Sequence, residues 1–270
     1  MSPEDTALKK VLDEVRAQCN VAERREIDPV GLVHRYEDPL DQELVGLVAA
    51  SVAFGNVAVI RAKLGDALAR VGTQPKRAAE SPKQLEEALH GWTHRVFRGE
   101  DIAKLFVGAR RVQRNEGTLG QRFARDFADT GSFREALAVW CDRLREAGGL
   151  GADGSGRRGP MHLLTDPRGP SGSKRLLLYA RWMVRRADGV DLGLWPVEPR
   201  HLVCPVDTHI HRLSTRLGLT QRKDKSWKTA EEITRGLARL DPEDPVKYDF
   251  ALCHLGMQPA TRVACDPDER

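Results

Sequence analysis

Two short segments, GPSGSK at residues 169–174 and CPVDTHIHR at residues 204–212, are each predicted to begin a helix. In the first, Gly172 allows a positive φ angle, so that the chain can turn sharply just before Lys174. In the second, Asp207 is a residue type that favours the N-cap position, where its side chain accepts backbone N–H groups. An amine and a carboxylate held at two helix starts can act together in nucleophilic attack at a sugar carbon.

Both segments also have an interpretation in which neither side chain takes part in chemistry. Glycine turns often precede helices, and a lysine at such a place is usually an ordinary surface residue. Aspartate is common at N-caps because of its hydrogen bonding alone. From the residue types, this alternative stays open for both Lys174 and Asp207.

Apolar residues recur with helical periodicity along most of the chain. The alternation that is typical of β-strands is scarce, so we predict an all-α fold. Helices are expected at residues 5–25, 43–53, 57–71, 82–89, 100–115, 119–127, 133–147, 174–186 and 226–240, at a start formed by Asp207 or Thr208, and from the break at 241–245 to Gly256. The glycine-rich residues 148–160 are expected to form a surface loop.

The composition favours a reduced protein that stays in the cytoplasm. The 270 residues are 40% hydrophobic and 30% charged, and no apolar run reaches membrane-spanning length. Five cysteines form no CxxC pair, which is typical of free thiols. A metal site made of Cys253, His254 and Cys265 matches no zinc spacing, so no metal is expected. The net charge is only +4, which permits a nucleic-acid partner without requiring one.

The residues from Pro205 to Arg212, with the segment RLGL at 216–219 after them, resemble the Val-Asp-Thr-His segment of the helix-hairpin-helix DNA glycosylases. That superfamily includes endonuclease III and the 8-oxoguanine glycosylases. The residues 172–174 resemble the Gly-x-Lys end of the family hairpin. The resemblance implies that Asp207 is the catalytic carboxylate and that Lys174 is the nucleophile that forms a Schiff base in bifunctional members.

The resemblance has departures as well as matches. Pro170 stands where the hairpin normally has its first glycine, and the gap from Lys174 to Asp207 is closer to that of the archaeal 8-oxoguanine glycosylases than to endonuclease III. The four-cysteine loop of endonuclease III is missing, so no iron–sulfur cluster is expected. The chain also resembles an uncharacterised prokaryotic family that carries the segments RWMVR at 181–185, DLGLW at 191–195 and DPEDPVKY at 241–248.

The resemblance further implies a two-lobed helical fold with a helix-hairpin-helix element and a cleft between the lobes. We expect residues 31–186 to form the central helical domain with the hairpin. Residues 1–30 and 187–270 are expected to form the second lobe, which carries the Asp207 helix.

DNA contacts follow by weaker inference, because a glycosylase extrudes its target base and must fill the gap. Asn56, after Phe54 and Gly55, is the candidate for contacting the orphaned partner base. The turn residues Gly172 and Ser173 and the side chains of Arg175 and Arg212 are candidates for phosphate contacts, as are Arg222, Lys223, Lys225 and Lys228. Trp182, Trp195 and Phe250 are candidate walls for the extruded base. His209 and His211 are given no catalytic role. Each of these residues also has an ordinary structural interpretation.

The function predicted from the sequence is a DNA-repair glycosylase, with lyase activity, that excises a damaged base such as an oxidised purine. Its partner would be double-stranded DNA, and it would act as a monomer in the cytoplasm, at the nucleoid. Two alternatives stay open. One is a DNA-binding protein without catalysis that recognises duplex shape or junctions, and the other is a hydrolase acting on nucleosides or RNA.

Overall fold

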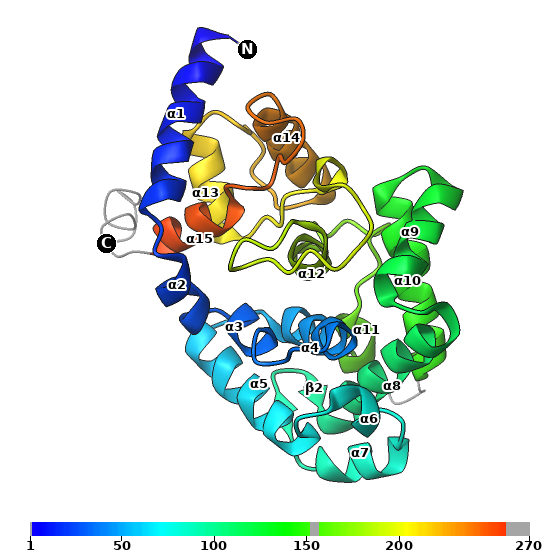
Figure 1. Ribbon diagram of the computed structural model, residues 1–270. Coiled ribbons are helices and arrows are strands. Elements are labelled where there is room, and N and C mark those ends of the chain that lie inside the picture. Colours follow the sequence, from blue (N-terminus) through cyan, green and yellow to red (C-terminus); the bar gives the residue numbers. More distant parts are fainter. Residues whose placement is uncertain (1, 152–156, 258–270) are drawn as a thin grey trace.

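The computed structural model describes residues 2–151 and 157–257, and this part of the chain is almost entirely helical (Figure 1). Its helices are α1 (Pro3–Gln18), α2 (Val21–Ile27), α3 (Val30–Val33), α4 (Pro39–Val52), α5 (Val57–Val71), α6 (Pro75–Ala78), α7 (Pro82–Ala88), α8 (Gly99–Glu116), α9 (Leu119–Thr130), α10 (Phe133–Gly148), α11 (Gly159–Leu163), α12 (Lys174–Val184), α13 (Thr208–Arg216), α14 (Trp227–Ala238) and α15 (Asp249–Met257), with a 3-10 helix at Pro199–His201. Two short strands, β1 (Thr93–His94) and β2 (Phe97–Arg98), pair antiparallel. The all-α prediction is confirmed for the described residues.

Two predicted helix boundaries are wrong, and local capping explains both. The expected helix at 5–25 is two helices, because Asn20 caps α2 by accepting the backbone N–H of Glu23 at 3.3 Å. The last helix begins at Asp249 rather than in the segment 241–245. There the carboxylate of Asp241 accepts two backbone N–H groups, from Glu243 at 3.1 Å and Asp244 at 3.2 Å, and holds the chain in a turn.

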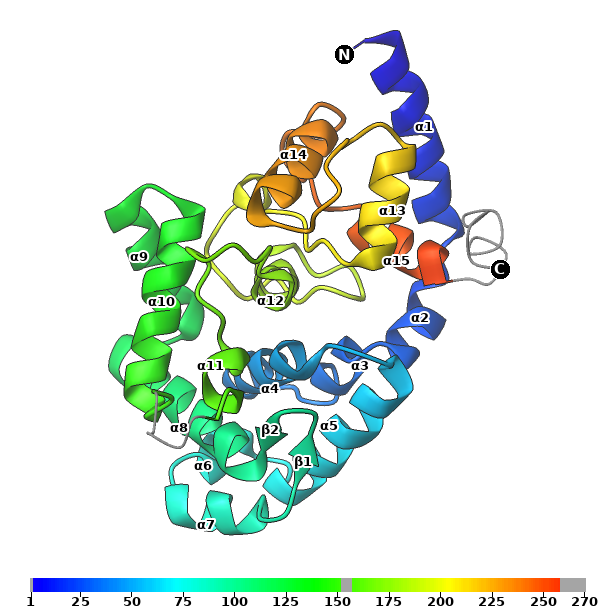
Figure 2. The same ribbon diagram turned by 180° about the vertical axis from the view of Figure 1, so that it is seen from behind.

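Helix α12 occupies the centre of the molecule and is seen nearly end-on in both views (Figures 1 and 2). It packs along α4, an apolar helix with most of its residues buried. Gly46 on α4 allows this contact, because a Cβ there would lie 2.6 Å from the Cε atom of Met183. Around this pair, α8 packs on α10, and α13 and α1 pack on α15. The start of α12 is therefore held by the core of the protein.

A single apolar cluster runs through the described residues. It includes Leu12 on α1, Leu47 on α4, Trp182 on α12 and Leu252 on α15, so both expected lobes contribute to it. The division of the chain at residues 31 and 186 stays a prediction. Within residues 2–151 and 157–257, no helix combines the length and the apolar character that a membrane crossing needs.

Glu43 is a carboxylate buried inside this core, with only 2% of its surface exposed. Its Oε1 atom accepts hydrogen bonds from the backbone of Gly120 and the indole of Trp195, and Oε2 accepts from the backbone of Leu119 and the amide of Gln113, all at 2.9 Å. Burial raises the pKa of Glu43, and these four donors oppose that shift. One side chain of α4 thus connects α8, the start of α9 and the segment after α12.

Replacing Glu43 with alanine is expected to lower the free energy of unfolding by about 3 kcal/mol, because buried donors lose their acceptor. Urea unfolding of the wild type and the variant measures the difference. The control is Glu86→Ala, which removes an exposed glutamate of α7 and should change stability by less than about 0.5 kcal/mol. Equal stability of the two variants would contradict this account of Glu43.

Candidate active site at two helix starts

A cavity of about 670 Å³ lies where the turn before α12, the segment before α13 and one face of α15 meet. Residues 171–175 and 205–209 line it, together with Asp28, Phe54 and Phe250. A cavity of this volume is in the usual range for small-molecule and cofactor sites. The two segments that carry the predicted lysine and aspartate therefore contribute to the same cavity.

Lys174 and Asp207 face each other inside this cavity. Lys174 is the first residue of α12, and its Nζ atom lies 3.5 Å from Oδ2 of Asp207. Asp207 is the N-cap of α13, and its Oδ1 atom accepts the backbone N–H of Ile210 at 2.8 Å. The thiol of Cys253 donates to Oδ2 at 3.5 Å. The aspartate side chain is 13% exposed and the lysine side chain 36%, so solvent reaches the amine more easily than the carboxylate.

The surroundings keep Asp207 ionised. Burial would raise the pKa of Asp207, but the charge of Lys174 and the hydrogen bond from Ile210 outweigh burial and hold it below its ordinary value. The thiol of Cys253 adds to this effect. Burial raises the pKa of the Cys253 thiol well above its usual value, so this group stays protonated and acts as a donor. At neutral pH the cavity thus presents a carboxylate anion beside an amine.

The turn before α12 is built differently from the sequence prediction. Gly172 is needed for close approach, because a Cβ there would lie 2.4 Å from the backbone oxygen of Lys225. The positive φ angle belongs to Ser173 instead, with φ 49° and ψ 32°. Within the described part of the chain, the buried Oγ atom of Ser173 has no hydrogen-bond partner. Left-handed backbone at a residue other than glycine costs free energy, and such strain is found often at functional sites.

The partly buried side chain of Arg175 is held by contacts within the protein. Its guanidinium donates to the backbone oxygens of Ser51, near the end of α4, and His162, near the end of α11. It also lies over the rings of Phe54, at 5.2 Å, and Phe97, at 5.9 Å. Burial lowers the pKa of Arg175 to about 10. Arg175 therefore caps two helix ends and anchors the start of α12. Its expected contact with a phosphate stays a prediction.

Four other residues predicted to contact DNA are buried in the core or hydrogen-bonded within the protein. Trp182 is fully buried in the core and does not line the cavity, and Trp195 is likewise buried, against Glu43. Asn56 is the N-cap of α5, where its Oδ1 accepts two backbone N–H groups. Arg212 donates to the backbone oxygen of Gly256 at 2.8 Å and lies outside the cavity. Among the proposed base-contacting aromatic residues, Phe250 is the one that lines the cavity.

Sequence reasoning named Phe250 of α15 as a cavity wall, but it missed Asp249 and considered Cys253 and His254 only as metal ligands. Residues 249, 250, 253 and 254 of α15 lie on one helical face and all line the cavity. Asp249 is buried and pairs with Arg181 of α12, and burial raises the pKa of Asp249 to about 6 against the effect of that arginine. The sequence feature that could have revealed this face is the presence of Asp249 and His254 within an otherwise apolar helix. Asp28, from the junction of α2 and α3, also lines the cavity and had no signal in the sequence.

The conceivable metal site cannot be placed as a set, because Cys265 lies outside the described residues. Cys253 and His254 both line the cavity. Among residues 2–151 and 157–257, no group of three or more histidine, cysteine or acidic side chains is arranged to hold a metal ion. The expectation of a site without metal or iron–sulfur cluster stays a prediction.

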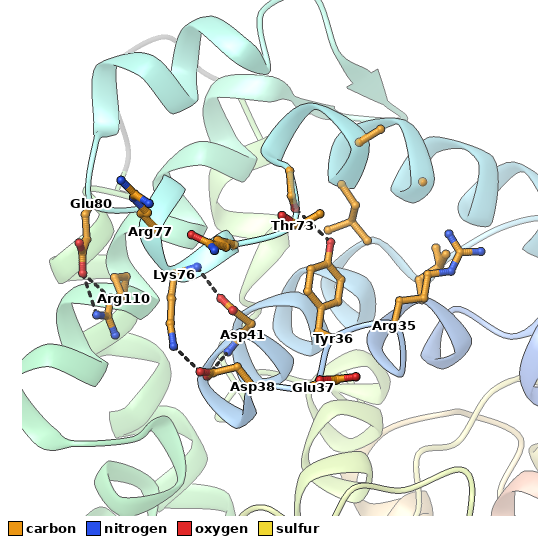
Figure 3. Close-up of a pocket in the computed structure, with 16 residues that line it drawn as sticks. Arg35, Tyr36, Glu37, Asp38, Asp41, Thr73, Lys76, Arg77, Glu80 and Arg110 are labelled. Carbon is orange, nitrogen blue, oxygen red and sulfur yellow. Dashed lines mark hydrogen bonds and ion pairs between the residues drawn. The ribbon is translucent and has the colours of Figure 1, made fainter.

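A second hollow, of about 860 Å³, lies between α4, α5, α6 and α8 and holds none of the predicted site residues (Figure 3). Its charged side chains largely pair with one another. Lys76 pairs with Asp38 and donates its backbone N–H to Asp41 at 2.6 Å, and Arg110 pairs with Glu80 at 2.7 Å. We take the cavity with Lys174 as the candidate site because it contains both the predicted lysine and the predicted aspartate.

These features define a helical protein with a lysine–aspartate pair in a cavity formed by distant parts of the chain. A family model described as "Protein of unknown function (DUF2400)" matches residues 28–258, so the chain belongs to this family. The matched range contains all the cavity residues named above. No curated protein and no solved structure matches the chain.

Replacing Gly172 with alanine is expected to destabilise the protein by about 2 kcal/mol, because the new Cβ meets a backbone oxygen that cannot move freely. Thermal or urea unfolding measures the change. The matched control is Gly65→Ala in α5, where an added Cβ meets no atom within 4 Å. That variant should be at least as stable as the wild type, because alanine favours a helix more than glycine does.

The stability contributed by Asp207 is expected to depend on pH. Because its pKa is lower in the folded than in the unfolded state, the carboxylate stabilises the fold above about pH 4, and this effect is lost as the pH falls through the folded pKa. Asp207→Asn should therefore cost about 1 kcal/mol near pH 7 and progressively less near pH 3. Urea unfolding across this range tests the point, and a difference that does not change with pH would contradict it.

Proposed function

We propose that this protein is a DNA glycosylase with an associated lyase activity, which removes a damaged base from double-stranded DNA. The observation that carries the proposal is the 3.5 Å approach of the Lys174 amine to the Asp207 carboxylate, at two helix starts and inside one cavity. A nucleophilic amine beside an anionic carboxylate suits a reaction in which a sugar carbon becomes cationic as its base departs. The pattern of residues that resembles helix-hairpin-helix glycosylases supports the same reaction.

In the proposed reaction, Lys174 loses a proton to solvent, which reaches its partly exposed side chain. Its Nζ atom then forms a bond to C1′ of the sugar as the glycosidic bond breaks, and the electron pair of that bond leaves with the base. The ionised carboxylate of Asp207 stabilises the positive charge that develops on the sugar. The bond between C1′ and the ring oxygen then breaks, the ring oxygen takes its electron pair and a proton from the new ammonium group, and a protonated Schiff base with Lys174 remains. Loss of a proton from C2′ to solvent then expels the 3′ phosphate and cleaves the strand by β-elimination.

The cavity is large enough to receive a base that has been rotated out of the duplex. The aromatic rings of Phe54 and Phe250 line it and offer flat apolar contact. At its edge, exposed Lys225 places its Nζ atom 3.5 Å from Oγ1 of Thr208, beside the catalytic aspartate. We assign Lys225 and the exposed Lys223 and Lys228 to contacts with DNA phosphates.

The substrate class proposed is duplex DNA with an oxidised purine, on which the protein would act as a monomer in the cytoplasm. A duplex-binding protein without catalysis would use the same basic surface but leave the lysine unreactive. Trapping of the Schiff base with borohydride separates these functions, because it reports covalent chemistry rather than affinity.

The test uses a duplex that contains an abasic site and a panel of duplexes that contain single damaged bases, among them 8-oxoguanine. With borohydride, the wild type should form a covalent adduct on the abasic duplex, and Lys174→Ala should form at least about 100-fold less. The control Lys83→Ala, which removes an exposed lysine of α7, should behave like the wild type. No adduct with any duplex, or an undiminished adduct in Lys174→Ala, would refute the proposed chemistry.

A further inference from the structure

His254 is a buried imidazole in the wall of the cavity, and its hydrogen-bonding capacity is unused. The residue is 4% exposed. Within the described residues, neither Nδ1 nor Nε2 has a hydrogen-bond partner. Buried polar groups are nearly always paired, so an unpaired one in a cavity wall indicates a partner that arrives with a ligand. His254 shares the cavity with Lys174 and Asp207, the pair proposed to act on the sugar.

The carboxylate of Asp28 lies close to one of the two ring nitrogens of His254. Its Oδ1 atom accepts the backbone N–H of Val30 at 2.9 Å, while Oδ2 lies 3.6 Å from Nε2 of His254. The ring of Phe250 packs against the imidazole with centroids 4.4 Å apart at an angle of 60°. Among the described residues, Nε2 is therefore the ring nitrogen that lies within ion-pair distance of a carboxylate, and Nδ1 forms no ion pair. A carboxylate behind an imidazole is a common arrangement for proton transfer.

Other ionisable groups face the cavity, from the α2–α3 junction, α12, α13 and α15. They are Asp28, Lys174, Arg175, Arg181, Asp207, His209, Asp249 and Cys253, with Lys225 from the segment before α14. Most of them already have partners: Asp249 pairs with Arg181, and Asp207 is held by Lys174 and Cys253. His209 also has an unpaired Nδ1 atom and is the competing histidine. No carboxylate lies within ion-pair distance of it among the described residues, in contrast to His254.

We infer that His254, oriented by Asp28, is the proton donor to the departing base. This inference rests on the proposed glycosylase function. When the glycosidic bond breaks, its electron pair passes to the ring nitrogen of the base, and that nitrogen takes the proton from Nδ1 of the imidazolium. Lys174 meanwhile forms the new bond to C1′ and has given one proton to solvent, and His254 regains a proton from solvent after the base leaves. Protons and charge therefore balance over one turnover.

A proton donor to the departing base is needed for one substrate of the enzyme, the damaged duplex, and not for another, the abasic duplex. A base must be protonated when it departs, whereas an abasic site has no base to lose. Proton donation of this kind typically contributes 100-fold or more to a rate. His254→Gln should therefore slow single-turnover excision of the damaged base by about 100-fold. It should leave borohydride trapping on the abasic duplex within about twofold of the wild type.

The experiment uses the full chain and the duplex of the lesion panel that the wild type excises fastest, together with the same duplex carrying an abasic site. Asp28→Asn should slow excision selectively, and Asp28→Glu should restore part of the rate, as expected for a positioning residue. The control His90→Gln, which changes an exposed histidine after α7, should leave both reactions unchanged. The deficit of His254→Gln should also shrink for bases that leave as stable anions, because they need the proton least.

Three results would overturn the inference. Equal loss of excision and of trapping in His254→Gln would show that the histidine supports the folded structure rather than proton transfer. Unchanged excision in that variant would exclude it from the reaction. A selective loss in His209→Gln, with none in His254→Gln, would assign the proton to the other histidine. If the wild type forms no covalent adduct on the abasic duplex, the proposed function itself is refuted. This outcome is distinct from the three results above.

Discussion

The buried ion pairs of Arg181 are the constraint on which the cavity depends. This guanidinium, in the middle of α12, pairs with Asp249 at the start of α15 and lies 3.1 Å from Asp191 in the segment that follows α12. All three side chains are almost fully buried. Removing one partner from such a group leaves a buried charge without compensation, which typically costs 3–5 kcal/mol. The arginine thus fixes α15, with its cavity-lining face, against the helix that begins with Lys174.

The start of α12 is fixed independently of these ion pairs. Arg175 ties it to the ends of α4 and α11, and the close contact of Gly172 with the backbone of Lys225 ties it to the segment before α14. Between them, Ser173 holds a strained backbone conformation that the contacts on both sides impose. A displacement of about 1 Å between reacting groups can remove most of the rate of a reaction. The contacts that hold the start of α12 in place are therefore important for the proposed reaction of Lys174.

Local signals predicted most of the helices and the two segments that bring Lys174 and Asp207 into one cavity. The helix at 57–71 was predicted to the residue, and the start of α13 was correctly capped by Asp207, because periodicity and N-cap preference act within a few residues. The roles of Arg175 and Trp182 were not predictable, since both depend on which surface becomes buried when α12 packs on α4. Asp28 joins the cavity from a position 226 residues before His254, and no spacing rule covers such a distance.

Several charged side chains in the cavity lie beside a group of opposite charge. This pairing determines which groups remain available to a ligand. Asp249 pairs with Arg181, and Asp207 lies beside Lys174, so each carboxylate has a cation next to it. Arg175 is compensated by backbone oxygens instead of a carboxylate. The contact of Asp28 with His254, at 3.6 Å, is too long for a hydrogen bond. Among the described residues, the cavity is also lined by groups without a hydrogen-bond partner, namely both ring nitrogens of His254, Nδ1 of His209 and Oγ of Ser173. These are the polar atoms that remain available to an entering ligand.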